Sequence, residues 1–201
     1  MDAFFDKIIS TDISILNYIQ EHLSCSFLDA VTPVITFLLE IGWIYILLAL
    51  VFLARPKTRK TGAMLGAALA IGVIVCSGFL KPVTGRIRPF SPEIVEKYGA
   101  LKTEADLIIK TPTDASWPSG HTVAAFEGAF VLLLRDKRFG IPAAVFAILI
   151  GFSRMYQFVH YPTDIIGGII VGGLSTLLSY LLINYMWKKL SPKYPDIFLE
   201  D

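Results

Sequence analysis

The chain has 201 residues, of which 54% are hydrophobic and only 17% are charged. Such a composition is too apolar for a soluble multidomain protein of this length, so we expect a single domain covering residues 1–201. The net charge of +1 leaves no broad basic surface that could neutralise the phosphates of a nucleic acid. A nucleic-acid-binding protein is therefore set aside.

Residues 1–24 form the first predicted element. Apolar side chains recur there at helical spacing among charged and polar ones, which indicates an amphipathic helix. The helix lies either in the membrane interface or against a helical bundle, because the periodicity is the same in both cases. We expect it to have no catalytic role. Its acidic start also argues against a cleaved secretory signal.

Five apolar stretches follow, each near the roughly 20 residues that cross a bilayer. The first contains Glu40 and Gly42, which we expect to divide it into a shallow part and a deeper part. The stretches cover residues 30–54, 61–80, 118–134, 139–158 and 164–187. The predicted fold is an all-α, polytopic membrane helix bundle with about five transmembrane helices.

The longest polar segment, residues 81–117, separates the second and third stretches, and we expect a loop there with a short helix. Basic clusters lie at the opposite ends of the predicted spans and in the tail 188–201. Because basic loops face the cytoplasm, we expect the tail inside the cell and the loop on the extracytoplasmic side of the plasma membrane. The clusters are Arg55, Lys57, Arg59 and Lys60; Arg135, Lys137 and Arg138; and Lys188, Lys189 and Lys193.

Three groups of polar residues fall at the extracytoplasmic ends of the predicted spans. The topology alone brings them to one side of the membrane. They are, in chain order, Lys81 with Arg88-Pro89, Pro118-Ser119-Gly120-His121, and Ser153-Arg154 with His160 and Asp164.

These residue types fit phosphoryl transfer, in which negative charge on the phosphoryl oxygens must be stabilised. Lys81, Arg88 and Arg154 supply positive charge, and a guanidinium group can bind phosphate through two parallel hydrogen bonds. Ser119 and Gly120 open a predicted helix, so their main-chain amides and the positive helix end can bind a phosphate oxygen. The three groups together predict a phosphate site.

Two histidines in these groups can divide the work of nucleophile and general acid. Asp164 follows His160 by four residues, a spacing at which its carboxylate can accept the ring N–H and fix the tautomer. We therefore assign His160 as the nucleophile and His121 as the proton donor to the leaving group.

The three groups resemble, in order and at every specified position, the signature of the type 2 phosphatidic acid phosphatase superfamily. The resemblance implies an enzyme that needs no metal and no cofactor. It also implies the same division of roles, with His160, His121 and Asp164 catalytic and with phosphate bound by Lys81, Arg88, Ser119, Gly120 and Arg154.

The resemblance further implies a lipid phosphate or lipid pyrophosphate as substrate. An outward-facing site favours undecaprenyl pyrophosphate, because the pyrophosphate of this lipid carrier appears on the outer face once its sugar cargo has been transferred. Phosphatidylglycerophosphate and phosphatidic acid stay open, since the motifs recognise phosphate and not the lipid tail. A non-catalytic lipid-binding or transport protein on the same fold is the alternative of another class, and the intact histidines argue against it.

Two further charged residues have no assigned role. Arg86, two residues before Arg88, is a candidate phosphate or headgroup contact that the family pattern does not require. Glu127 lies within a predicted span, where an ionisable group is costly unless paired. We expect it to form a buried hydrogen bond to a neighbouring helix.

Overall fold

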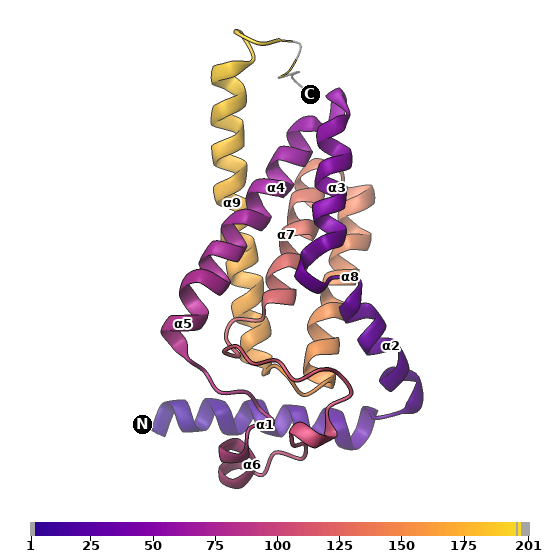
Figure 1. Ribbon diagram of the computed structural model, residues 1–201, viewed down its shortest axis with the longest axis vertical. Helices are drawn as coiled ribbons and strands as arrows, with labels where there is room; N and C mark the ends of the chain where they lie inside the picture. Colours follow the sequence, from indigo (N-terminus) through magenta and orange to yellow (C-terminus); the bar gives the residue numbers. More distant parts are fainter. Residues whose placement is uncertain (1–2, 196, 198–201) are drawn as a thin grey trace.

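The computed structural model describes residues 3–195 and 197, and every regular element in that part of the chain is helical (Figure 1), so the all-α prediction is confirmed. The helices are α1 (Ala3–Leu23), α2 (Ser26–Phe37), α3 (Trp43–Ala54), α4 (Arg59–Val73), α5 (Lys81–Thr84), α6 (Pro92–Tyr98), α7 (Gly120–Arg135), α8 (Lys137–Tyr156) and α9 (Pro162–Leu190). The predicted cytoplasmic tail 188–201 is described only in part, because residues 196 and 198–201 lie outside the described ranges, as do residues 1 and 2 of the N-terminal segment.

Helix α1 lies across one end of the bundle, where it contacts α6, α8 and α9 (Figure 1). Its inner face buries Ile13 and Leu16 against Phe158 and Tyr161, and each such side chain contributes about 1.5–3 kcal/mol relative to an exposed one. Its other face leaves apolar side chains such as Phe4 exposed. The helix therefore packs against the bundle and also presents an apolar surface of the kind that binds a membrane interface.

The first apolar stretch is divided at the position predicted from Glu40 and Gly42. Helix α2 ends at Phe37, a 3-10 turn covers Glu40–Gly42, and α3 begins at Trp43. Gly42 has a φ of +71°, a left-handed conformation that glycine adopts without a steric penalty. The turn therefore allows two short helices to run at different angles.

The second apolar stretch is longer than predicted. The helix that begins as α4 continues through a π-helical segment, Ile74–Leu80, into α5 and ends at Thr84. Lys81 therefore belongs to the end of a helix and not to the loop. Gly85, with a φ of +53°, stops the helix, and the chain then forms the predicted polar loop, with α6 as its short helix.

Helices α7, α8 and α9 form the part of the core that carries the polar motifs, and α7 contacts both of the others. Gly168 allows α9 to approach the start of α7, because a Cβ atom at this position would lie 2.7 Å from Thr122 Cβ and 3.0 Å from Ser119 O. This close packing places the first turn of α9 beside the first turn of α7.

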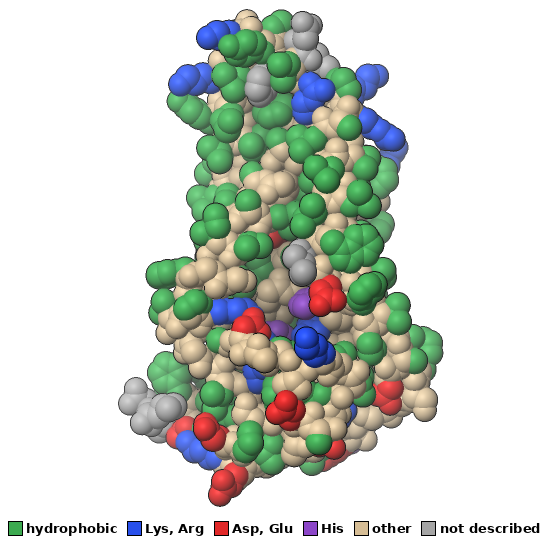
Figure 2. All heavy atoms as spheres, in the orientation of Figure 1, with side chains coloured by type: hydrophobic (Ala, Val, Ile, Leu, Met, Phe, Trp, Pro, Cys, Tyr) green, Lys and Arg blue, Asp and Glu red, His purple; other side chains and the backbone are tan. Residues whose placement is uncertain are grey.

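In the part of the chain that the structure describes, three continuous helices are long and apolar enough to cross a membrane: Pro56–Thr84, Lys137–Tyr156 and Pro162–Leu190. Helices α2 and α3 are shorter apolar helices, and α7 has 16 residues. The multi-pass membrane fold is confirmed, whereas the number of five spans stays a prediction. Figure 2 shows Lys and Arg side chains without acidic ones at one end, a largely uncharged band, and a mixture of basic, acidic and histidine side chains towards the other end.

Candidate active site

The predicted site residues come together at the end of the bundle that α1 covers. Lys81 ends its helix, Arg88 lies in the following loop, and His160 and Asp164 lie between α8 and the first turn of α9. Arg154, His160, Lys81 and Arg88 are all close enough to His121 to act on it electrostatically. The three sequence motifs therefore form one site.

His160 is held in one orientation by its neighbours. Its Nδ1 atom lies 3.1 Å from Asp164 Oδ2, and its Nε2 atom lies 3.4 Å from Arg88 Nη1. Because an ionised carboxylate can only accept, the proton of the neutral ring is assigned to Nδ1. Burial, which outweighs the opposing hydrogen bond to Asp164, lowers the pKa of His160 to about 3. At neutral pH Nε2 therefore carries a lone pair, and this lone pair faces the Arg88 donor.

We expect this imidazole to stay neutral at a pH where a model-peptide histidine, with a pKa of about 6.5, is protonated. A folded-state pKa below the unfolded value means that protons bind only at more acidic pH. Ring ¹⁵N chemical shifts of histidine-labelled protein in detergent, followed from pH 8 to pH 5 and assigned with His160→Ala, measure this. A His160 signal that titrates near pH 6.5 would contradict the burial argument.

Asp164 is completely buried, and both of its carboxylate oxygens are occupied. Oδ2 accepts hydrogen bonds from the Ser116 hydroxyl, from the Tyr161 amide at 2.9 Å and from His160. Oδ1 accepts from Arg86 Nη1 at 2.6 Å. Arg86 thus pairs with a carboxylate of the site, and its candidate role as a phosphate or headgroup contact stays a prediction.

The cations Lys81 and Arg88 meet at Asp114, a residue that the motifs did not indicate. Lys81 Nζ donates to Asp114 Oδ2, and Arg88 Nη2 donates to Asp114 Oδ1 at 2.7 Å. Partial burial opposes ionisation, but the hydrogen bond and charge of Lys81, together with Arg88, hold the pKa of Asp114 at about 2. Its side chain is 55% exposed, so a carboxylate covers the two cations from the solvent side.

We expect this carboxylate to compete with phosphate for the same two cations. In Asp114→Asn, inorganic phosphate should inhibit at a concentration about 10-fold lower, in line with the 1.5–3 kcal/mol of hydrogen bonds to charged groups. Inhibition constants for the wild type, for Asp114→Asn and for Asp106→Asn in the same loop measure the effect. Weaker inhibition in Asp114→Asn would mean that Asp114 serves to orient the cations.

Arg154 approaches the site from the last turn of α8. Its Nη1 atom donates to Gln157 Oε1 at 2.8 Å, and Gln157 in turn bonds to Thr36 of α2. The Nε atom of Arg154 is buried without a hydrogen-bond partner among the described residues. A buried guanidinium group with an unsatisfied donor is suited to an anionic ligand.

The start of α7 supplies the third phosphate-binding element. Ser119 is the N-cap residue, and its hydroxyl oxygen accepts hydrogen bonds from Thr122 N and Thr122 Oγ1. Its own hydroxyl proton is therefore available to a phosphate oxygen. The Ser119 amide donates to Asp164 O at 3.2 Å, so the main-chain donors at this helix end are those of Gly120 and His121.

His121 lies in the same first turn, and its Nε2 atom is buried without a hydrogen-bond partner in the described part of the chain. A ring nitrogen with no protein partner, placed among three cations and a second histidine, is suited to exchange a proton with a bound substrate. The role of His121 as proton donor to the leaving group stays a prediction.

Two histidines and three cations thus lie together at one end of a bundle with membrane-length helices. The PAP2 superfamily model matches residues 61–188, and the chain belongs to that superfamily. Undecaprenyl-diphosphatase BcrC of Bacillus subtilis strain 168 is 30% identical over 164 residues, which are 80% of this chain and 76% of that protein.

Two solved structures share the fold. The crystal structure of Aquifex aeolicus LpxE superimposes with a TM-score of 0.67 at 24% identity, covering 83% of this chain and 93% of that chain. The first transmembrane PAP2 type phosphatidylglycerolphosphate phosphatase from Bacillus subtilis gives a TM-score of 0.62 at 23% identity, covering 94% and 89%. The chain is thus a phosphatase of the PAP2 superfamily with the membrane fold of these proteins.

Proposed function

We propose that the chain hydrolyses undecaprenyl pyrophosphate, or a closely related lipid pyrophosphate, through a phosphohistidine on His160. The observation that carries this proposal is the position of the unprotonated His160 Nε2, which lies 3.4 Å from Arg88 Nη1. The 30% identity with an undecaprenyl-diphosphatase over most of both chains supports the choice of substrate.

The first step transfers the terminal phosphoryl group to the protein. His160 Nε2 forms a bond to phosphorus while the bridging P–O bond breaks, and the bridging oxygen leaves with the bonding electrons. His121, in its protonated imidazolium form, gives that oxygen a proton and becomes neutral, so that the lipid monophosphate departs. Lys81, Arg88 and Arg154 stabilise the charge on the three remaining phosphoryl oxygens.

The second step returns the protein to its starting state. A water molecule gives a proton to His121 and attacks phosphorus, and the P–N bond breaks with its electrons returning to His160 Nε2. Inorganic phosphate is released. Asp164 keeps the Nδ1 proton in place and stabilises the positive charge of the ring in the intermediate.

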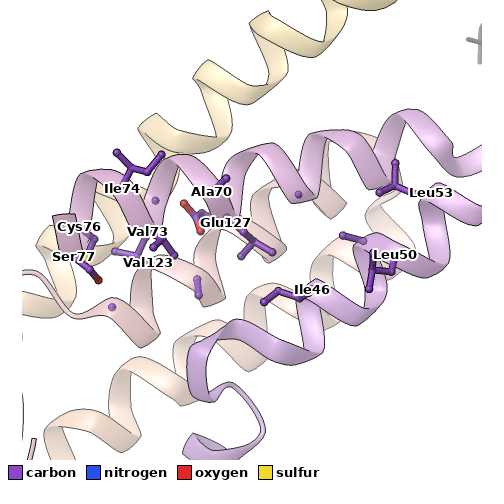
Figure 3. Close-up of a pocket in the computed structure, with 16 residues that line it drawn as sticks. Ile46, Leu50, Leu53, Ala70, Val73, Ile74, Cys76, Ser77, Val123 and Glu127 are labelled. Atoms are coloured by element: carbon purple, nitrogen blue, oxygen red, sulfur yellow. The ribbon is translucent and has the colours of Figure 1, made fainter. Parts of the chain in front are cut away.

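An apolar cavity next to the site supports a lipid substrate. It has a volume of about 530 Å³ and lies between α3, α4 and α7, extending from Gly120 and Cys76 at the site to Leu50 and Leu53 (Figure 3). Its walls are almost entirely hydrophobic, which suits a hydrocarbon chain whose phosphate is held at the start of α7.

Glu127 is the acidic side chain in the wall of this cavity, which Figure 3 shows. Its carboxyl group interacts with Ser175 of α9, while its Oε1 atom is buried without a hydrogen-bond partner among the described residues. Gly72 of α4 leaves the space that the carboxyl group fills.

Phosphate release from lipids, measured with purified protein in detergent and excess EDTA, tests the proposal. Undecaprenyl pyrophosphate should be hydrolysed fastest, ahead of phosphatidylglycerophosphate and phosphatidic acid, and chelation should leave the rate nearly unchanged because side chains supply the positive charge. If phosphatidylglycerophosphate or phosphatidic acid were hydrolysed faster than undecaprenyl pyrophosphate, that lipid would be the preferred substrate instead. Absence of turnover on every lipid would support the non-catalytic alternative.

We also propose that the site faces away from the cytoplasm, because the basic clusters lie at the opposite helix ends. In a Cys25→Ser background, which removes the exposed native cysteine, a cysteine introduced by Glu96→Cys on α6 should react with an impermeant maleimide in intact cells. The control Lys188→Cys, at the opposite end of α9, should react only after lysis. The reverse pattern would overturn this orientation.

A further inference from the structure

Helix α1 reaches the active site through a single buried carboxylate. Asp12 is 2% exposed, because it lies on the face of α1 that packs against the bundle. Its oxygens accept hydrogen bonds from Thr163 N at 3.2 Å, from the Thr163 hydroxyl and from Arg86 Nη2 at 2.8 Å. A buried carboxylate is costly unless it is paired and hydrogen-bonded, and here both conditions are met at the start of α9.

Arg86 joins Asp12 to Asp164. Its Nη2 atom bonds to Asp12, while its Nη1 atom bonds to Asp164 Oδ1 at 2.6 Å and to Thr163 Oγ1 at 2.7 Å. The guanidinium carbon also lies 4.0 Å from the centroid of the Tyr161 ring. The planar guanidinium fork is thus fixed on both edges and on one face, a geometry that lysine cannot reproduce.

The contacts of Arg86 fix the orientation of the Asp164 carboxylate relative to His160. Arg86 occupies Oδ1, so Oδ2 is left for His160 Nδ1 at 3.1 Å. Rotation of the carboxylate would break the bond to Arg86 and the bond to His160 at once. The direction of the His160 ring, and with it the position of Nε2, therefore depends on Arg86 and on the Asp12 that holds Arg86.

We propose that Asp12 and Arg86 are positioning residues for phosphoryl transfer, and that docking of α1 onto the bundle sets the orientation of His160. The proposal rests on the proposed roles of His160 and Asp164. Neither residue touches the substrate; both act through Asp164. From the sequence we expected the N-terminal helix to have no catalytic role. In this proposal it helps to position the nucleophile.

Contacts that only hold α1 on the bundle would behave differently from contacts that position the nucleophile. Loss of purely stabilising contacts lowers the melting temperature but leaves kcat of the folded protein unchanged. Loss of positioning lowers kcat with little change in KM, because a misplaced nucleophile can cost up to about 100-fold in rate while the phosphate is still bound. We expect Asp12→Asn and Arg86→Lys each to lower kcat by about 10- to 100-fold.

Asp6→Asn is the matched control. Asp6 lies on the same helix and also pairs with a cation, Lys97, at 2.9 Å, and with Tyr98 at 2.6 Å, but it makes no contact with Thr163 or Arg86 among the described residues. Its replacement should leave kcat within about 2-fold, as for an exposed ion pair. The double variant Asp12→Asn/Arg86→Met should be no slower than Arg86→Met alone, because the two residues act as one unit.

A second measurement does not depend on turnover. The ¹H resonance of the His160 Nδ1–H group, observed in ¹⁵N-histidine-labelled protein and assigned with His160→Ala, reports the hydrogen bond to Asp164. It should shift in Asp12→Asn and stay in place in Asp6→Asn. If Asp12→Asn does not fold, Thr163→Val removes the hydroxyl between Asp12 and Arg86 while keeping both charges, and it should shift the same resonance.

The outcomes separate this proposal from the proposed function. An unchanged resonance and an unchanged kcat in the variants that fold, with an active wild type, would overturn the positioning role and leave the phosphatase assignment intact. If the resonance shifts in Asp12→Asn but the wild-type protein releases no phosphate from any lipid, the positioning network is upheld and the assigned reaction is overturned.

Discussion

His160→Ala should abolish the phosphoenzyme and lower turnover by a factor on the order of 10⁴ or more, as expected when a nucleophile is removed. The alanine leaves the phosphate site intact, because Lys81, Arg88 and Arg154 are anchored by other residues. Lipid binding should therefore survive the substitution. Rapid-quench trapping of an acid-labile, base-stable phosphoprotein measures the intermediate directly.

His121→Ala is the matched comparison, because it removes the other histidine of the site. It should still form the phosphoenzyme, but more slowly, since general acid catalysis contributes roughly 10²–10⁴-fold. An aryl phosphate, whose leaving group needs little protonation, should recover part of the rate, and phosphatidic acid should recover the least. A normal yield of phosphoprotein from His160→Ala, with none from His121→Ala, would reverse the two assignments.

Much of the site could be predicted because its residues lie at the ends of helices. Lys81, the start of α7 and the pair His160 and Asp164 are placed by the order of the apolar stretches, and a helix bundle brings such ends together. The spacing of four residues between His160 and Asp164 predicted a contact that the structure has at 3.1 Å. These are local features of the chain.

Long-range pairing could not be predicted in the same way. Asp114 lies in the polar loop with no periodicity to direct it, and its contacts with Lys81 and Arg88 cross 33 and 26 positions of sequence. Arg86 bonds to partners 74 and 78 positions away. Only the folded structure shows that Lys81, Arg86 and Arg88 each form an ion pair with a carboxylate instead of being hydrated by solvent.

One signal for Asp12 was present in the sequence. It lies three residues after Ile9, next to Ile13 and four before Leu16, so helical periodicity places it on the face that α1 buries. A charged residue on a buried helix face requires a partner. This pattern indicates a buried ion pair, whereas the identity of the partner depends on how α1 crosses the bundle.

Asp164→Asn should retain the lipid but slow phosphoryl transfer by about 10³- to 10⁴-fold, by analogy with the loss of the carboxylate in a Ser-His-Asp triad. The amide can no longer accept hydrogen bonds at both positions, so either the bond from Arg86 or the bond from His160 is lost. The favoured tautomer of His160 then changes, and the proton moves to the Nε2 atom that must attack phosphorus. Without a proton on Nε2 the ring is a nucleophile; with one it is not.

Pre-steady-state measurement of phosphoenzyme formation, beside the KM for the lipid, tests this expectation. Ser116→Ala is the control, because it removes one hydrogen bond to the same Asp164 oxygen without changing the charge of the site. Its effect should be about 10-fold or less, the cost of a single hydrogen bond. If Asp164→Asn reduced the rate no more than Ser116→Ala, the carboxylate would not control the tautomer, and the orientation of His160 would have to come from Arg88 and the surrounding packing.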